Sequence, residues 1–152
     1  MMNAELMWKC AKRVMSDVKN PLLKIIRVLL FFLRSWPFDL QYKEFTRDEF
    51  NEVVNKFRQW CEEKQLHYQF DYFDCDDFAM EFKSFCAREF NHNGVLIALG
   101  MVSKDGRVLG GHAWNITLIE GRIYYFEPQT FELIDGNTST DGFKYELMAV
   151  VG

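Results

Sequence analysis

Asp71-Tyr72-Phe73-Asp74-Cys75-Asp76-Asp77-Phe78-Ala79 places one cysteine among four acidic residues, and the rest of the chain is organised around this stretch. The apolar residues from Phe78 to Cys86 keep the three-and-four spacing of a buried helical face. Asp74 is suited to cap such a helix, and Asp77 to lie in its first turn. Cys75 is then the first helical residue, where free N–H groups and the helix dipole favour a thiolate.

The carboxylates around Cys75 oppose this effect, because like charges disfavour a second anion. A reactive thiolate at this position therefore needs a neighbouring cation, either a histidinium or a metal ion. Carboxylate oxygens suit hard ions such as calcium, magnesium or manganese. The alternative is a buried structural cysteine behind an acidic helix cap, since free cysteines commonly fill cores.

The composition describes one globular domain. The 152 residues are 49% hydrophobic and 26% charged, an ordinary balance for a chain long enough to bury a core. The net charge of −4 argues against nucleic acid as a partner. The four cysteines have neither a disulfide framework nor a CxxC metal pattern, and the chain does not begin with a secretory signal. We therefore expect a reducing, cytoplasmic location, with Cys61 and Cys86 buried.

The sequence predicts helices in the first part of the chain and strands in the second. Residues 4–19 and 22–36 predict two helices, and a capping box formed by Thr46 and Glu49 begins a third. After Asn93-Gly94, apolar segments separated by tight turns predict an antiparallel sheet. The strands are expected at 95–102, 108–119, 122–129 and 143–151. These elements predict one α+β domain over 1–152, with a helical part at 1–65 and a core helix and sheet at 66–152.

The segment 22–36 is strongly apolar, and Lys24, Arg27 and Arg34 line one narrow stripe of it. It is too short, and too often interrupted by charge, to span a bilayer. A core helix or a partner-binding helix is the favoured interpretation. Contact with a membrane interface is the less favoured alternative.

A second group of polar residues lies on a predicted hairpin. If Glu120-Gly121 is a two-residue turn, His112 lies opposite Gln129 and Trp114 lies opposite Glu127. All four side chains then project from one face of the hairpin. His112 and Glu127 become diagonal neighbours, close enough for their side chains to meet.

The helix start and the hairpin together suggest a reactive site. A carboxylate on one imidazole nitrogen leaves the other nitrogen free to act as a base. This predicts Cys75 as nucleophile, His112 as base and Glu127 as the residue that orients His112. Gln69, six residues before Cys75, is a candidate donor to a developing oxyanion.

Three further polar residues are left out of this site. Asn115 faces away from His112 by the alternation of side chains along a strand. His67 lies in a polar segment after the third helix, and His92 lies between two asparagines at a turn. We expect both histidines at the surface.

These motifs resemble those of papain-like cysteine proteases, in which a cysteine opens a helix and a histidine strand is followed by an orienter strand. The segments Asp74–Ala79, Gly111–Asn115 and Glu127–Gln129 more closely resemble the calcium-dependent protease domain of the mushroom-agglutinin type. Related single-domain proteins of this type occur in phages and bacteria. The resemblance covers residues 66–130.

The resemblance implies a papain-like fold and a calcium- or manganese-dependent thiol protease, a hydrolase that acts on a peptide or protein substrate through an acyl-enzyme. It assigns the metal to Asp74, Asp76, Asp77 and Gln129. A catalytically silent metal- or partner-binding module and an amidase or transglutaminase-like acyl transferase are the alternatives. Residues 1–65 have no counterpart in the resemblance, and sugar binding is not implied by it.

Overall fold

The computed structural model describes all 152 residues, and it has an α+β fold in which four helices precede a five-stranded antiparallel sheet. The helices are α1 (Asn3–Ser16), α2 (Pro21–Arg34), α3 (Arg47–Glu63) and α4 (Cys75–Phe90). The strands are β1 (Val95–Lys104), β2 (Arg107–Ile119), β3 (Arg122–Glu127), β4 (Glu132–Ile134) and β5 (Lys144–Val151). The predicted class and order of elements are confirmed, except that β4 was not predicted because three residues carry too little periodicity.

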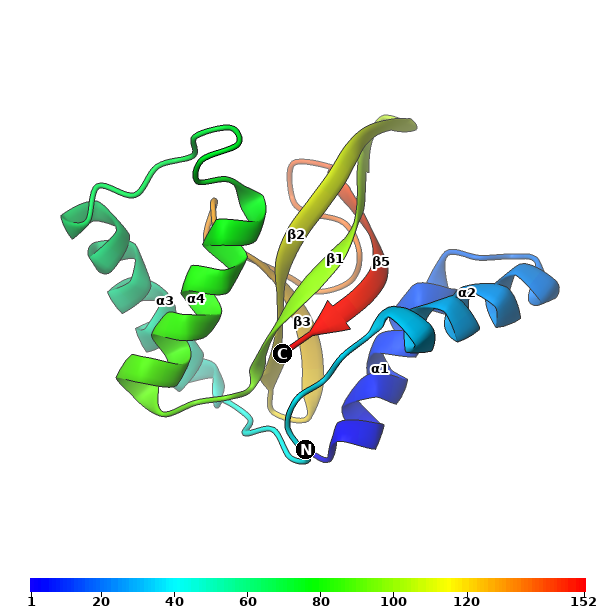
Figure 1. Ribbon diagram of the computed structural model, residues 1–152, viewed down its shortest axis with the longest axis horizontal. Coiled ribbons are helices and arrows are strands. Elements are labelled where there is room, and N and C mark those ends of the chain that lie inside the picture. Colours follow the sequence, from blue (N-terminus) through cyan, green and yellow to red (C-terminus); the bar gives the residue numbers. More distant parts are fainter.

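The sheet has the order β4-β3-β2-β1-β5, so the C-terminal strand returns to pair with β1 (Figure 1). The turn between β2 and β3 contains Glu120 and Gly121, both with positive φ, as a tight two-residue hairpin turn requires. Asn115 pairs with Phe126, which is the register that the turn predicts. The sequence therefore placed the hairpin that carries His112 and Glu127 correctly.

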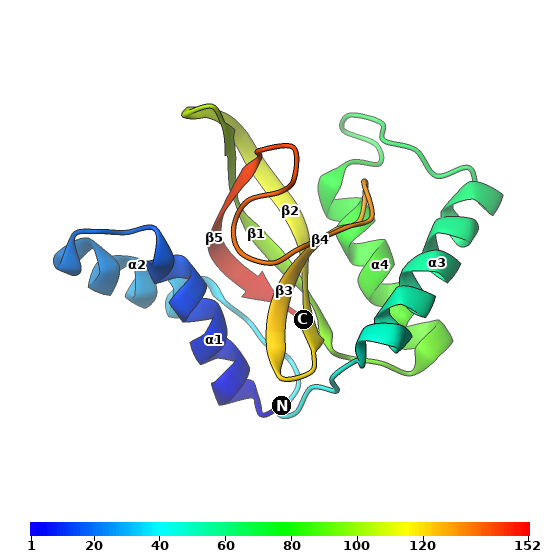
Figure 2. The ribbon, with the colours of Figure 1, turned by 180° about the vertical axis from the view of Figure 1, so that it is seen from behind.

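The sheet lies between two pairs of helices. Figures 1 and 2 show α1 and α2 on one side of the sheet and α3 and α4 on the other. Two apolar clusters correspond to these two sides. One joins α1 and α2 to the sheet through residues such as Leu6, Phe31 and Trp114. The other joins α3 and α4 to it through residues such as Phe57 and Phe82.

The helix α2 differs from the other three in how little of it is buried. Its inward side chain Phe31 is the one residue of α2 in the buried class, although the helix has ten apolar residues after its first position. Asn20 caps the helix by accepting hydrogen bonds from the N–H groups of Leu22 and Leu23. No helix in the structure has the length and apolarity needed to cross a bilayer.

Candidate functional site

The helix α4 begins with a reciprocal cap formed by acidic residues. The N–H of Asp76 donates to Oδ1 of Asp74 at 3.4 Å, and the N–H of Asp74 donates to Oδ2 of Asp77 at 3.2 Å. These bonds satisfy donors that the first turn of a helix leaves free. Cys75 is the first residue of the helix, as the sequence predicted, and it is half-buried.

The hairpin supplies a histidine and a carboxylate in direct contact. The Nε2 atom of His112 lies 2.6 Å from Oε2 of Glu127, and the Glu127 side chain is only 5% exposed. The hydroxyl of Tyr145, on β5, donates to the same carboxylate oxygen at 3.2 Å. The N–H of Gln129 donates to the other oxygen at 3.3 Å. Glu127 is therefore held by donors on both of its oxygens.

His112 lies between this carboxylate and the thiol of Cys75. Burial lowers the pKa of His112, but a hydrogen bond to Cys75, a hydrogen bond to Glu127 and the charges of both groups outweigh burial. The pKa is raised to about 9. At neutral pH the ring is an imidazolium, the cation that the acidic surroundings of Cys75 require. The geometry thus places an imidazolium, oriented by a carboxylate, beside the sulfur of Cys75.

Cys75 is half-buried, whereas the other three cysteines are buried. Burial raises the pKa of Cys10 to about 12 and that of Cys61 to about 11, and it raises the pKa of Cys86 further. These thiols fill the core, as expected for Cys61 and Cys86.

A cleft of about 180 Å³ lies beside His112 and Glu127. It contains two further carboxylates, an amide, two hydroxyl-bearing residues and the rings of Phe143 and Tyr145. Such a lining combines hydrogen-bond acceptors, donors and aromatic faces. The sequence did not indicate Tyr145 or the loop after β4 as part of the site, although side-chain alternation along β5 places Tyr145 on one face with Leu147. The lining residues are Val102, His112, Glu127, Gln129, Thr130, Glu132, Ser139, Asp141, Phe143 and Tyr145.

The acidic turn offers a group of possible metal ligands. One ligand atom from each of Asp74, Cys75 and Asp76 lies within 4.8 Å of the others. A hydrogen bond between the two side chains raises the pKa of Asp76 and lowers that of Asp74. A hard cation bound between the two carboxylates would offset their mutual repulsion. Two carboxylates fit such an ion, although calcium needs six to eight oxygens in all.

The remaining predicted site residues are placed elsewhere. Asp77 uses a carboxylate oxygen in the helix cap. Gln129 lines the cleft beside Glu127 and has no contact with the acidic turn among the described hydrogen bonds. The amide of Gln69 is exposed and lies 2.9 Å from Nε2 of His67. The structure therefore brings together Cys75, His112 and Glu127, and it gives no contact between Gln69 and this group.

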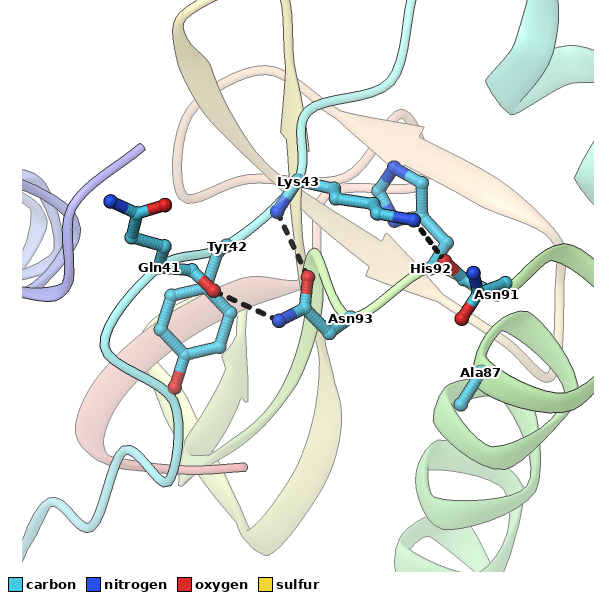
Figure 3. A pocket seen from close by; sticks show the side chains of 7 residues that line it. All are labelled: Gln41, Tyr42, Lys43, Ala87, Asn91, His92 and Asn93. Atoms are coloured by element: carbon cyan, nitrogen blue, oxygen red, sulfur yellow. Dashed lines mark hydrogen bonds between the residues drawn. The ribbon is translucent and has the colours of Figure 1, made fainter.

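A larger hollow of about 400 Å³ lies near the C-terminal end of α4 (Figure 3). Its polar groups are bonded to one another: the Asn93 amide donates to the carbonyl of Gln41 and accepts from the N–H of Lys43. His92 was expected at the surface, but its ring stacks on Phe45 and burial lowers its pKa. The hollow lies between residues 41–43, which precede α3, and residues 87–93, at the end of α4. Its lining residues are Gln41, Tyr42, Lys43, Ala87, Asn91, His92 and Asn93.

Comparison with known protein families gives one match. The family described as "Ricin-type beta-trefoil lectin C-terminal domain" matches residues 33–144. No curated protein is similar to the chain in sequence at a significant level.

Ten chains of solved structures are similar to this one, among them the following two. A complex of PSL1a with E64 is 25% identical, with a TM-score of 0.58 over 81% of this chain and 43% of that one. A Polyporus squamosus lectin bound to the human-type influenza-binding epitope Neu5Aca2-6Galb1-4GlcNAc is 18% identical. That match has a TM-score of 0.60 and covers 100% of this chain and 49% of the lectin. The chain thus spans less than half the length of either relative.

These findings contradict the identification as a papain-like cysteine protease, and with it the predicted hydrolase activity and the peptide or protein substrate. The matched family is described as a lectin domain, and the similar structures include a lectin with its glycan. The prediction rested on three short motifs and on the proximity of Cys75, His112 and Glu127. Such proximity does not by itself specify a reaction or a ligand.

Proposed function

Because the chain belongs to the family of ricin-type beta-trefoil lectin C-terminal domains, we propose that it is a carbohydrate-binding domain whose binding site is the cleft beside His112 and Glu127. The observation that carries this proposal is the lining of the cleft. It places carboxylates, an amide and hydroxyls around a space of about 180 Å³ beside aromatic rings.

A sugar presents hydroxyl groups that both donate and accept hydrogen bonds, together with apolar C–H faces. The carboxylates of Glu132 and Asp141 accept from such hydroxyls, and the amide of Gln129 both donates and accepts. The ring of Phe143 offers an apolar surface for the C–H face. The His112 ring, with its pKa raised to about 9, adds positive charge to the cleft wall, and its contact with Glu127 holds that carboxylate in place.

Calcium or manganese is proposed as a cofactor at the turn of Asp74, Cys75 and Asp76. The close approach of their ligand atoms supports this assignment. A bound cation would offset the negative charge beside the thiolate and hold the start of α4 in place. Asp77 and Gln129 are weaker candidates as metal ligands. Asp77 caps the helix, and Gln129 lies beside Glu127.

The predicted roles of Cys75 as nucleophile and His112 as base belong to the hydrolase and are given up with it. We keep Glu127 as the residue that orients His112, and the position of His112 beside Cys75; the contacts among the three residues support both. Gln69 as an oxyanion donor has no such support. A papain-like arrangement is proposed for the finer fold, because a helix that begins with the cysteine packs against the sheet that carries the histidine. The cytoplasmic location stays a prediction.

Calorimetric titration of the purified chain with Neu5Aca2-6Galb1-4GlcNAc and with lactose, each in calcium, in manganese and in EDTA, tests the proposal. We expect binding that weakens at least about ten-fold in His112→Ala, because the cleft loses a positive charge and the contact that holds Glu127 in place. His67→Ala is the matched control, since His67 is an exposed histidine outside the cleft. It should bind like the wild type.

Two results would overturn the proposal. The first is equal affinity of His112→Ala and the wild type for a bound sugar. The second is absence of sugar binding together with Cys75-dependent release of fragments from casein, because cleavage of a protein requires a different assignment of the cleft.

A further inference from the structure

The exposed apolar residues of this protein are concentrated in one place. Eleven of its 21 exposed large hydrophobic side chains lie between residues 22 and 40, on α2 and the segment that follows it. Their exposed parts add up to roughly 1,000 Å², whereas the largest apolar patch of a monomer is typically about 300–600 Å². We call them the α2 apolar surface: Leu22, Leu23, Ile25, Ile26, Leu29, Leu30, Phe32, Leu33, Trp36, Phe38 and Leu40.

The α2 apolar surface occupies most of the circumference of the helix. At about 100° per residue, Lys24, Arg27 and Arg34 all fall within a sector of roughly 80°. Phe31, which packs into the core, lies in the same sector. The outward side therefore has no charged residue over an arc of more than about 200°. Packing against one partner helix covers a stripe of only about 100°. An apolar arc this wide is therefore better suited to lipid, which can contact the helix on several sides, than to a single packed helix.

The charged residues of α2 itself are all basic. From Val18 to Phe38 the chain has four basic residues and no acidic one, although the whole chain has a net charge of −4. Arg27 is paired with Glu146 at 2.7 Å. Lys19, Lys24 and Arg34 take part in none of the ion pairs of the structure. These three cations complement an anionic surface near the helix.

The position of the helix leaves this surface accessible. Figures 1 and 2 show α2 at the periphery of the molecule, on the opposite side of the sheet from α3 and α4. The groove between α1 and the segment after α2 adds further apolar lining, from Met2, Met7, Phe32 and Leu40. Trp36 follows directly after the helix and is 68% exposed, and tryptophan is favoured at the boundary between headgroups and acyl chains.

We propose that the α2 apolar surface docks on a membrane that contains anionic phospholipid, with the helix lying in the plane of the interface. Leu29 and Leu33 enter the acyl boundary, while Lys24 and Arg34 extend along the polar side of the helix to lipid phosphates. Docking in this way would hold the domain at a membrane surface, whatever ligand the cleft binds.

Co-sedimentation with unilamellar vesicles tests the proposal, using phosphatidylcholine alone and phosphatidylcholine mixed with phosphatidylserine. We expect the wild type to bind the mixed vesicles more tightly and to lose that preference as salt is raised. Leu29→Glu combined with Leu33→Glu should abolish binding. Lys24→Gln and Arg34→Gln should each weaken binding to mixed vesicles about five-fold, with little effect on neutral ones.

Val108→Glu combined with Leu109→Glu is the matched control, because it places two charges on another exposed apolar site at the far end of β2. It should bind vesicles like the wild type. All substituted positions are exposed or half-buried, so circular dichroism should report the same fold for each variant. Absence of vesicle binding would overturn the proposal. If sedimentation equilibrium then gave a dimer that Leu29→Glu and Leu33→Glu dissociate, the occupant would be a second copy of the chain.

Discussion

The Nε2 atom of His112 and Oε2 of Glu127 are 2.6 Å apart, and the side chains come from two strands joined by a two-residue turn. The contact exists because the turn sets the register and the residues are diagonal neighbours on one face. Tyr145 adds a second hydrogen bond to the same oxygen from β5. The hairpin thus brings His112 and Glu127 into contact, and the hydrogen bond from Tyr145 on β5 holds the Glu127 carboxylate in position.

Replacing Glu127 with Gln should lower the pKa of His112 from about 9 toward its ordinary value of 6.5. Gln keeps the size of the side chain but removes the negative charge. The titration of the His112 ring proton followed by NMR measures this change. Tyr145→Phe, which removes one donor to Glu127 but keeps its charge, should leave the pKa much nearer 9. Equal pKa values in Glu127→Gln and the wild type would contradict the role of Glu127.

The same shift predicts how stability depends on pH. The pKa of His112 is higher in the folded than in the unfolded state, so its contribution is fully present below about pH 6.5 and lost as pH rises toward 9. We expect the free energy of unfolding to fall by on the order of 2 kcal/mol over this window. Urea denaturation at several pH values measures it. Glu127→Gln should show a much flatter dependence.

Iodoacetamide should modify Cys75 well before the other cysteines. Cys75 is half-buried beside an imidazolium, whereas Cys10, Cys61 and Cys86 are buried with raised pKa values. Mass spectrometry of the native protein at pH 7 should find one adduct, and Cys75→Ala should give none. The rate should fall in His112→Ala, because the neighbouring cation is lost. Labelling of Cys61 at the rate of Cys75 would show that the thiolate is not favoured.

Calcium should raise the melting temperature of the wild type and have little effect on Asp76→Asn. Asp76 supplies an oxygen to the acidic cluster, and its raised pKa reflects the nearby Asp74. Differential scanning calorimetry in calcium and in EDTA measures the difference. Asp48→Asn is the matched control, because Asp48 is also an exposed aspartate in the first turn of a helix. If both variants respond to calcium like the wild type, no ion binds at this turn.

Much of this geometry follows from local sequence signals. The cap of Asp74 and Asp77 fixes the start of α4, and the turn at Glu120-Gly121 fixes the hairpin register. Both depend on residues a few positions apart, so their physical causes are visible in the sequence. The contact of Tyr145 with Glu127 depends instead on the return of β5 to the sheet, which no local pattern specifies.

Two other features could not be read from the sequence for related reasons. The apolar periodicity of α2 describes a helix but not which side meets the domain, so its outward apolar surface appears only with the fold. His92 lies between polar neighbours in the sequence, yet the chain before α3 brings Phe45 onto its ring. The error about function had another origin. Cys75, His112 and Glu127 do lie together in the structure, but three adjacent side chains do not determine the ligand of a domain.

Asn115 should be among the most important polar residues for stability. Its side chain is fully buried, and Nδ2 donates to the carbonyl of Ala79 on α4 at 2.9 Å and to that of Leu96 on β1 at 3.2 Å. It therefore ties the helix that begins with Cys75 to the sheet that carries His112. Asn115→Ala leaves two buried carbonyls without this donor and creates a cavity.

We expect Asn115→Ala to lower the free energy of unfolding by about 2–4 kcal/mol. Urea denaturation measures the loss, and Asn51→Ala, at an exposed position of α3, should change it by less than about 0.5 kcal/mol. Because Asn115 holds α4 against the sheet, the variant should also alkylate more slowly at Cys75, since the thiol loses its fixed position beside His112. A variant as stable as the wild type would mean that packing alone, without this amide, aligns the helix and the hairpin.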